Sequence, residues 1–310
     1  MSNYKRTGRQ RGPTRITGQG DQRYIMVRYR TVLATLTLCL LAPTLVVAAT
    51  TTREECFRQF SPRTGQAGKD VIWVPTVDEL VTAMLKAANV GPNDYVIDLG
   101  AGDGKIAIAA AKQFGARALG VEYNPQMVQL ARCYVRVEGL SDKVQIVQGD
   151  IFETDFSQAT VLTLYLLTEL NLKLRPKILQ MKPGTRVVSN TFKMGDWSPD
   201  QFIESEIGNT RAYLWIVPAQ IEGLWEFRDE DSGETFRVQF QQHYQEIKSA
   251  SVPGQQTRAI RDAKLRGAQI EFTLADGQPL RLQGSVDGDV MRLSAQAGNE
   301  RRYFVGRRMR

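Results

Sequence analysis

The residues best suited to chemistry form a glycine-rich segment, Asp98-Leu-Gly-Ala-Gly-Asp-Gly104, which follows the apolar run Tyr95-Val-Ile. Glycines between a strand and a helix let the backbone approach a ligand closely, and the free amides at the helix start favour negative charge. Asp98 precedes the first glycine by two residues, which suits a positively charged group such as an amino-acid ammonium. A dinucleotide fingerprint requires G-x-G-x-x-G, but here the third glycine comes one residue early, which disfavours a nucleotide-dependent oxidoreductase.

Two more acidic residues end short apolar runs further along the chain. Glu122 closes the run at 118–121, and Asp150 follows the run at 144–147. A single acid at a strand end is commonly a turn-capping or solvated residue, but three acids ending three successive strands are harder to explain in that way. We therefore interpret Asp98, Glu122 and Asp150 as parts of one binding site.

Predicted strands and helices alternate between about Val71 and Val217. The predicted strands are at 95–99, 118–122, 144–147, 161–165, 186–189 and 213–217. The predicted helices follow Thr76, run from 106 to 114 and from 125 to 139, and end at 181. Thr76 and Glu79 have capping-box spacing, Gly115 follows the second helix, and Asn124 and Pro125 begin the third. This alternation predicts an α/β fold with a parallel sheet covered on both faces.

The glycine segment and the acid that ends the second strand resemble the class I S-adenosylmethionine-dependent methyltransferases, over roughly residues 71–217. The resemblance implies a Rossmann-like parallel sheet with S-adenosyl-L-methionine as cofactor. It places the methionine moiety at Asp98 and the glycine loop, the ribose hydroxyls at Glu122, and the exocyclic amine of adenine at Asp150. The cofactor-binding residues that it implies are Asp98, Gly100, Ala101, Gly102, Gly104, Glu122, Tyr123, Asp150 and Ile151.

Within this class, Trp73-Val-Pro-Thr76, the Gly-Asp-Gly-Lys105 loop and Glu122-Tyr-Asn-Pro125 resemble one branch. That branch holds the protein-lysine methyltransferases of the ATP-synthase c-subunit type and their bacterial relatives, and it implies a protein lysine amine as acceptor. The segment 165–171 would admit the acceptor, and it lacks the Asn-Pro-Pro-Tyr type of motif of adenine-N6 and amide methyltransferases. Thr76 and Tyr165 are therefore substrate-lining candidates, although Tyr165 is equally well explained as an aromatic residue packed on the core.

No catalytic residue is named, because a desolvated channel lowers the pKa of a lysine amine and no dedicated base is then required. The chain has a single histidine, His243, and no cysteine pair with metal-ligand spacing, so we expect no metal site.

Beyond Pro218 the pattern changes to short alternating runs separated by turn formers such as Asp231-Ser-Gly233 and Asp287-Gly288. The predicted strands here are at 224–227, 235–240, 269–274, 280–283, 290–293 and 303–305. Residues 218–310 are thus expected to form a smaller antiparallel β-rich domain, either a sandwich or a barrel. This domain carries no motif that points to a role.

The net charge of +7 lies in residues 1–30, a basic leader with eight basic residues and one acid. Residues 31–310 carry 32 basic and 32 acidic residues, so the body of the protein offers no general attraction to nucleic acid. Residues 31–49 are uncharged and end in Val-Ala-Ala49, which is typical of a signal peptide, with an uncleaved membrane anchor as the alternative. Translation from Met26 would give a more compact signal sequence than translation from Met1.

These features predict an exported, periplasmic or membrane-attached protein. S-adenosylmethionine is not expected to be available outside the cytoplasm, so this location conflicts with the expected cofactor. Contact with a membrane would run through residues 31–49. The alternative function is an exported, non-catalytic binding protein that uses the methyltransferase fold as a scaffold. The intact acids Asp98, Glu122 and Asp150 favour the enzyme.

We predict that the mature chain starts at or near Thr50, because the uncharged run ends at Ala49 in small residues that signal peptidase accepts. Amino-terminal sequencing of the protein isolated from its native cell tests this expectation. A chain that still carries residues 31–49 would indicate a membrane anchor instead.

Overall fold

A computed structural model describes residues 51–204, 210–250, 256–276, 279–298 and 300–309. The basic leader, the apolar run at 31–49 and the expected cleavage site lie outside the described residues. Within the part of the chain that is described, no helix is long and apolar enough to cross a membrane.

The amino-terminal part of the described chain is built on a seven-stranded sheet in the order β3-β2-β1-β4-β5-β7-β6. Its strands are β1 (Tyr95–Leu99), β2 (Arg117–Glu122), β3 (Val144–Gln148), β4 (Val161–Leu164), β5 (Arg186–Asn190), β6 (Gln201–Glu204) and β7 (Arg211–Ile216). Strands β1 to β5 pair in parallel, whereas β7 pairs antiparallel with β5 and with β6. The predicted parallel sheet is confirmed, and β6 is an edge strand that the sequence pattern did not predict.

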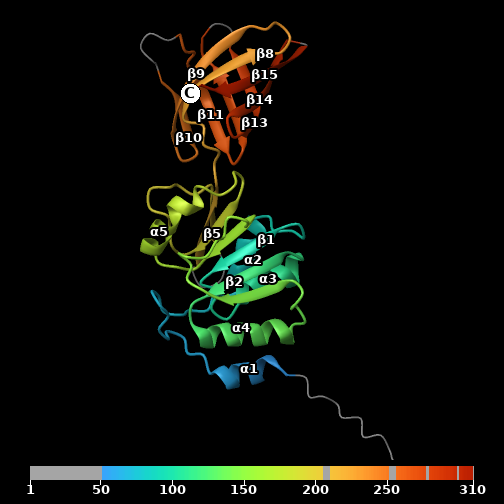
Figure 1. The fold of residues 1–310 in the computed structure, drawn as a ribbon, viewed down its shortest axis with the longest axis vertical. Helices are drawn as coiled ribbons and strands as arrows, with labels where there is room; N and C mark the ends of the chain where they lie inside the picture. The colour runs from blue at the N-terminus through green and yellow to red at the C-terminus, as the bar shows by residue number, and fades with distance from the viewer. Residues whose placement is uncertain (1–50, 205–209, 251–255, 277–278, 299, 310) are drawn as a thin grey trace, which may run out of the picture. The chain divides into compact units, whose positions relative to one another are not determined.

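The sheet divides the apolar core into two clusters, and the described residues of this part also form five helices (Figure 1). They are α1 (Arg53–Phe60), α2 (Asp78–Ala87), α3 (Lys105–Phe114), α4 (Pro125–Val137) and α5 (Thr168–Ile178). Apolar side chains of α2, α3 and α4 share one buried cluster with Val96 of β1, while those of α5 share the other with Ile97. Neighbouring residues of a strand point to opposite faces, so this division is that of a sheet covered on both sides.

Two of the predicted helix ends are confirmed, and one is wrong. Gly115 ends α3 in the left-handed conformation, and the Asn124 side chain accepts hydrogen bonds from the first turn of α4. The predicted capping box at Thr76 does not form, because α2 begins at Asp78 with Val77 as a cap that makes no side-chain bond. The Thr76 hydroxyl instead accepts a hydrogen bond of 3.1 Å from the side-chain Nδ2 of Asn190, at the end of β5.

Helix α1 lies ahead of the expected start of the domain near residue 71 and packs alongside α4 (Figure 1). A disulfide joins Cys56 of α1 to Cys133 of α4, and both residues are buried. The Arg53 guanidinium lies 3.9 Å from the centre of the Tyr134 ring and donates a 3.0 Å hydrogen bond to Glu138. The sequence analysis predicted neither this helix nor the disulfide, since the two cysteines are 77 residues apart.

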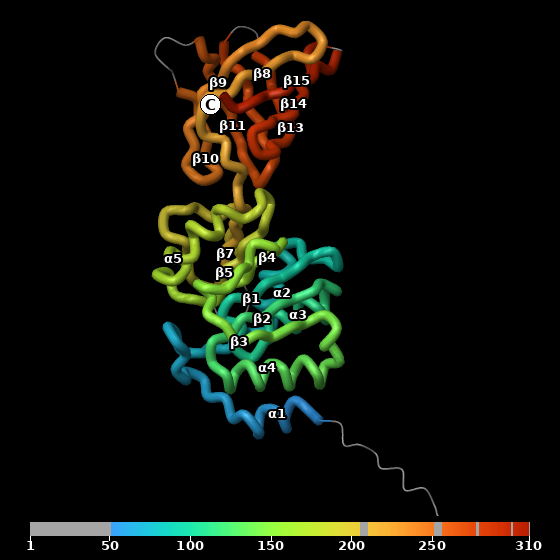
Figure 2. The backbone as a smooth tube through the Cα atoms, viewed as in Figure 1, coloured from blue at the N-terminus to red at the C-terminus, as the bar shows by residue number. Residues whose placement is uncertain are grey.

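The carboxyl-terminal part forms a second sheet of eight antiparallel strands in the order β10-β9-β8-β15-β14-β13-β12-β11 (Figure 2). Its strands are β8 (Gly223–Asp229), β9 (Thr235–His243), β10 (Glu246–Ser249), β11 (Ile260–Arg266), β12 (Gln269–Leu274), β13 (Leu280–Asp287), β14 (Val290–Ala297) and β15 (Glu300–Arg308). The end strands β10 and β11 also contact each other, so the sheet curls toward a barrel.

The barrel has its own apolar core, in which the rings of Phe227, Phe240 and Phe272 meet edge to face. The predicted antiparallel β-rich unit is therefore confirmed, although β10 and β11 were missed. Strand β11 is rich in charge and has a register shift between Arg261 and Lys264, which interrupts the alternation that identifies a strand.

Candidate active site

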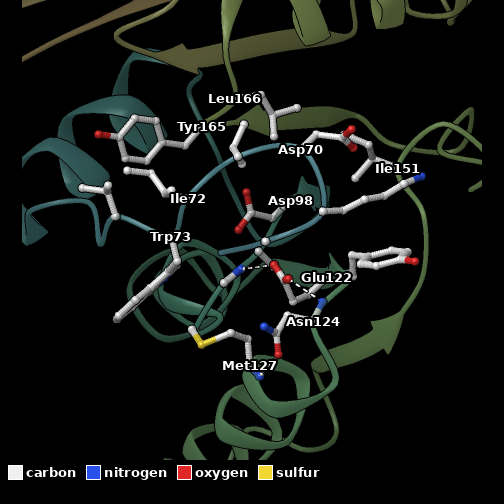
Figure 3. A pocket seen from close by; sticks show the side chains of 18 of the residues that line it. Asp70, Ile72, Trp73, Asp98, Glu122, Asn124, Met127, Ile151, Tyr165 and Leu166 are labelled. Carbon is white, nitrogen blue, oxygen red and sulfur yellow. Dashed lines mark hydrogen bonds between the residues drawn. The ribbon is translucent and has the colours of Figure 1, made fainter. Parts of the chain in front are cut away.

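A cavity of about 470 Å³ lies at the carboxyl ends of the parallel strands (Figure 3). Its lining includes the three predicted acids, Asp98 at β1, Glu122 at β2 and Asp150 just beyond β3. Every residue from 66 to 76 lines it as well. Parallel strands end at the same edge of a sheet, which explains how acids 24 and 28 residues apart in the sequence meet in one cavity.

The glycine loop turns sharply between β1 and α3. Gly100, Gly102 and Gly104 have φ values of 82°, 54° and 78°, in the left-handed region that side chains disfavour. A Cβ atom on Gly102 would also lie only 2.6 Å from the Trp73 indole nitrogen, so a side chain there would displace Trp73 from the pocket wall. The loop is held to β2 because the amides of Gly100 and Ala101 both donate to the carbonyl of Val121, at 2.9 Å.

Glu122 connects the glycine loop to the start of α4. One carboxylate oxygen accepts a 2.9 Å hydrogen bond from the Gly102 amide, and the other accepts one of 2.8 Å from the Asn124 amide (Figure 3). Each carboxylate oxygen has two lone pairs, so both can accept a further hydrogen bond from a ligand. The side chain is thereby fixed in position while it keeps the capacity to bind two hydroxyl groups.

Asp98 is only 2% exposed and accepts a 2.7 Å hydrogen bond from the Thr163 hydroxyl of β4. Burial raises the pKa of this carboxyl group to about 7, and the neighbouring acids Asp103 and Glu122 contribute in the same direction, although the Thr163 bond opposes them. Burial also raises the pKa of Asp103. A cationic ligand group next to Asp98 would stabilise its carboxylate form.

At the other end of the cavity, Asp150 accepts a 2.9 Å hydrogen bond from the Phe152 amide on one carboxylate oxygen. Its second oxygen forms an ion pair with the Lys69 ammonium, which also lies 5.2 Å from the centre of the Tyr123 ring. The hydrogen bond between the two side chains lowers the pKa of Asp150 and raises that of Lys69. The Asp150 carboxylate is thus already paired with a side chain of the protein.

The remaining wall is apolar. Leu166, Leu167, Leu170 and Phe192 line it together with the two substrate-lining candidates, Thr76 and Tyr165. The rings of Tyr165 and Phe192 lie 6.4 Å apart, and burial raises the pKa of the Tyr165 hydroxyl. Leu166 and Leu170 of this wall are buried, whereas Leu167 is exposed, so the wall offers an aliphatic chain a partly desolvated apolar surface.

Of the nine residues that the sequence assigned to the cofactor, eight line the cavity, and their roles toward the cofactor remain predictions. Gly104 lies outside it, at the beginning of α3, where it packs against Ala131. The sequence analysis missed the lining segment 66–72, which has neither periodicity nor a motif. It also missed Lys105, whose ammonium donates a 2.9 Å hydrogen bond to the Thr76 carbonyl.

Among the described residues, no group of three or more histidine, cysteine, aspartate or glutamate side chains is placed to hold a metal ion. The lining of the cavity combines the oxygen acceptors of its acids with apolar side chains. The strand order, the glycine loop after β1 and the acids at successive strand ends define a class I S-adenosylmethionine-dependent methyltransferase.

Comparison with known proteins agrees with this class. A family model described as the ANTKMT methyltransferase domain matches residues 98–201. A protein-lysine N-methyltransferase of Saccharolobus islandicus (strain REY15A) is 43% identical over 151 residues, which cover 47% of this chain and 94% of that protein. The lysine N-methyltransferase of the ATP-synthase c-subunit from Homo sapiens is 31% identical over 119 residues, 38% of this chain and 51% of that protein. The chain belongs to the S-adenosylmethionine-dependent methyltransferase family of these relatives.

Among solved structures, this chain is similar to an RNA methyltransferase from Salinibacter ruber in complex with S-adenosyl-L-homocysteine. The sequence identity is 46%, the match covers 48% of this chain and 96% of that one, and the TM-score is 0.46.

The cavity fits the cofactor of this family. S-adenosylmethionine carries an ammonium, a ribose diol and an adenine amine, and the cavity holds a buried carboxyl group, a carboxylate with two available oxygens and a second carboxylate. Asp98 would hold the ammonium, Glu122 the ribose hydroxyls and Asp150 the adenine amine. The glycine loop would approach the amino-acid part. The chain is an S-adenosylmethionine-dependent methyltransferase.

We predict that Glu122→Ala weakens the binding of S-adenosylmethionine about tenfold to hundredfold. The loss of charge-assisted hydrogen bonds to the ribose costs roughly 1.5–3 kcal/mol. Isothermal titration calorimetry measures the affinity, far-UV circular dichroism checks the fold, and Glu79→Ala on the exposed face of α2 is the matched control. Unchanged affinity in Glu122→Ala would refute the assignment of this residue.

The raised pKa of Asp98 predicts that cofactor affinity depends on pH. A bound ammonium favours the carboxylate, so binding below pH 7 must release the proton that Asp98 carries there. Affinity should therefore rise with pH by up to about tenfold per unit and level off above 7. Titration of S-adenosylhomocysteine between pH 5.5 and 8 in two buffers of different ionisation enthalpy measures both the affinity and the released proton.

In this experiment Asp98→Asn is the matched variant, and its binding should be weak and independent of pH below 7. An affinity of the wild-type protein that stays constant or falls as the pH rises toward 7 would contradict the role of Asp98.

Proposed function

We propose that the acceptor of the methyl group is the amine of a protein lysine. The names of the relatives support this proposal, because both the archaeal and the human protein are described as lysine N-methyltransferases. The human relative matches over about half of its length, so its own substrate is not transferred to this chain.

The observation that carries the proposal is the apolar wall of the cavity beside its acids. Leu166, Leu167, Leu170 and Phe192 can contact the methylene groups of a lysine side chain. The lining contains five acids (Asp70, Asp98, Asp103, Glu122 and Asp150) but only two basic residues (Lys69 and Lys105). Burial disfavours the charged forms of Asp98 and Asp103, so the attraction for a cationic amine comes mainly from the other carboxylates, and desolvation against the apolar wall then lowers the pKa of that amine.

S-adenosylmethionine supplies a methyl group on a positively charged sulfur when it is bound. Transfer of such a group in line depends on the alignment of the reactants and on the exclusion of water. Asp98, the glycine loop and Glu122 would fix the cofactor, while the apolar wall would hold the amine in its neutral, nucleophilic form. The chain needs no dedicated base for this chemistry, and the proton of the amine passes to solvent before transfer.

We also propose that the chain works outside the reducing cytoplasm, as the uncharged run at 31–49 led us to expect. The buried Cys56–Cys133 disulfide supports this location, because disulfides persist mainly in oxidising compartments. Amino-terminal sequencing of the native protein tests this proposal too, since a cleaved chain would establish export.

We predict that the purified protein, incubated with cofactor labelled in the methyl group, labels protein lysines and not nucleic acid. Separate pools of membrane protein, soluble protein, RNA and DNA from the source cell serve as acceptors. Glu122→Ala, assayed at a cofactor concentration below its raised Kd, is the matched control in which labelling should fall. Mass spectrometry of the labelled protein should find methyl-lysine, and replacing that lysine by arginine should abolish the label. Label in RNA or DNA with none on lysine would overturn the acceptor while leaving the methyltransferase intact.

A further inference from the structure

The outer wall of the cofactor cavity is one irregular segment, residues 65–76, which we call the strap. Within it, an isolated antiparallel bridge joins Ala67 and Ile72. The strap is folded back on itself by backbone hydrogen bonds, from Gly65 to the Trp73 carbonyl at 2.8 Å and from Trp73 to the Gln66 carbonyl at 2.9 Å. Such a segment needs anchors elsewhere to keep a defined position over the cavity.

The strap touches the residues that the cofactor would touch. Its Lys69 pairs with Asp150. The indole of its Trp73, labelled in Figure 3, lies against Gly102 of the glycine loop. At its end, the Thr76 carbonyl accepts the hydrogen bond from Lys105. Because all three contacts are with lining residues, a displaced strap would remove one wall of the cavity and the contacts that shape the glycine loop.

The strap is preceded by α1, and α1 is poorly held by apolar packing. Of the eight residues of α1, all of them described, only Cys56 is buried. A helix of this length is not stable alone in water, and one buried side chain contributes little apolar burial. The ion pair of Arg53 with Glu138 is partly exposed, and such pairs contribute about 0–1 kcal/mol. The disulfide to Cys133 is thus the one covalent cross-link between α1 and the described part of the fold, beside the partly buried packing of Phe60 and the contact of Arg53 with the Tyr134 ring.

We propose that the Cys56–Cys133 disulfide is a positioning element of the cofactor site. By holding α1 on α4, it keeps the strap over the cavity, so that cofactor affinity depends on the bond being formed. A dithiol reductant breaks the bond by transferring two electrons and two protons to the sulfurs, which yields two thiols while the reductant becomes a disulfide. Cys56 and Cys133 belong to one of the two apolar clusters, but the other buried side chains of both clusters pack without this bond, so we expect the reduced chain to stay folded.

The test compares the affinity for S-adenosylhomocysteine of the full chain before and after reduction by dithiothreitol, measured by calorimetry. If the reduced chain keeps the strap closed about a tenth of the time, the apparent Kd rises about tenfold. The variant C56S/C133S should bind as weakly as the reduced protein and should not respond to dithiothreitol. Any protein used that retains residue 39 carries Cys39→Ser to prevent exchange with the third cysteine, and reoxidation should restore the original affinity.

Two measurements separate this positioning role from a general loss of structure. Far-UV circular dichroism should be unchanged on reduction, while trypsin should cut more rapidly after Arg63 and Lys69, in and just before the strap. Unchanged affinity in the reduced, folded protein would overturn the proposal, and so would unfolding of the reduced chain. Neither readout uses a methyl acceptor, so the result is independent of the lysine proposal.

Discussion

The binding site depends most on the acidic residues that the parallel strands bring together at one edge of the sheet. Asp98 is almost fully buried with one hydroxyl partner, and Asp103 and Glu122 oppose its ionisation. Burying acids together is unfavourable unless a cation or hydrogen-bond donors compensate for them. The parallel strands bring the acids together, and the glycine loop presents its amides to Glu122, so the site is prepared for a ligand that is both cationic and rich in hydroxyl and amine donors.

The cavity wall beside this acidic edge is the strap, which comes from a different part of the chain. The interactions that hold it differ from those that hold the sheet. The sheet is held by apolar clusters on both faces, whereas the segment 65–76 is held by a few hydrogen bonds, one ion pair, the partly buried side chains of Val71 and Trp73, and the helix before it. The fold thus combines a rigid sheet edge with a wall whose position depends in part on the Cys56–Cys133 disulfide. Such a division is common where a ligand must enter and leave a buried site.

Local sequence signals predicted the acids and the glycine loop at the sheet edge. These signals are a turn with glycines at Gly100 and Gly102 and an acid at a strand end, and each involves only residues that are neighbours in the sequence. The contacts that the sequence did not predict join distant residues. Thr76 has the spacing of a helix cap, yet its hydroxyl binds Asn190, 114 positions away. The disulfide and the lining strap likewise depend on pairings across the fold that leave no periodic pattern in the chain.

The central claim is that the acidic edge, the glycine loop and the strap together enclose one molecule of cofactor. A crystal structure of the full chain with S-adenosylhomocysteine tests this claim most directly. The account predicts the ligand ammonium next to Asp98, the ribose hydroxyls on Glu122 and the strap closed over the ligand with the disulfide intact. A ligand bound outside this cavity, or with its ribose away from Glu122, would contradict it.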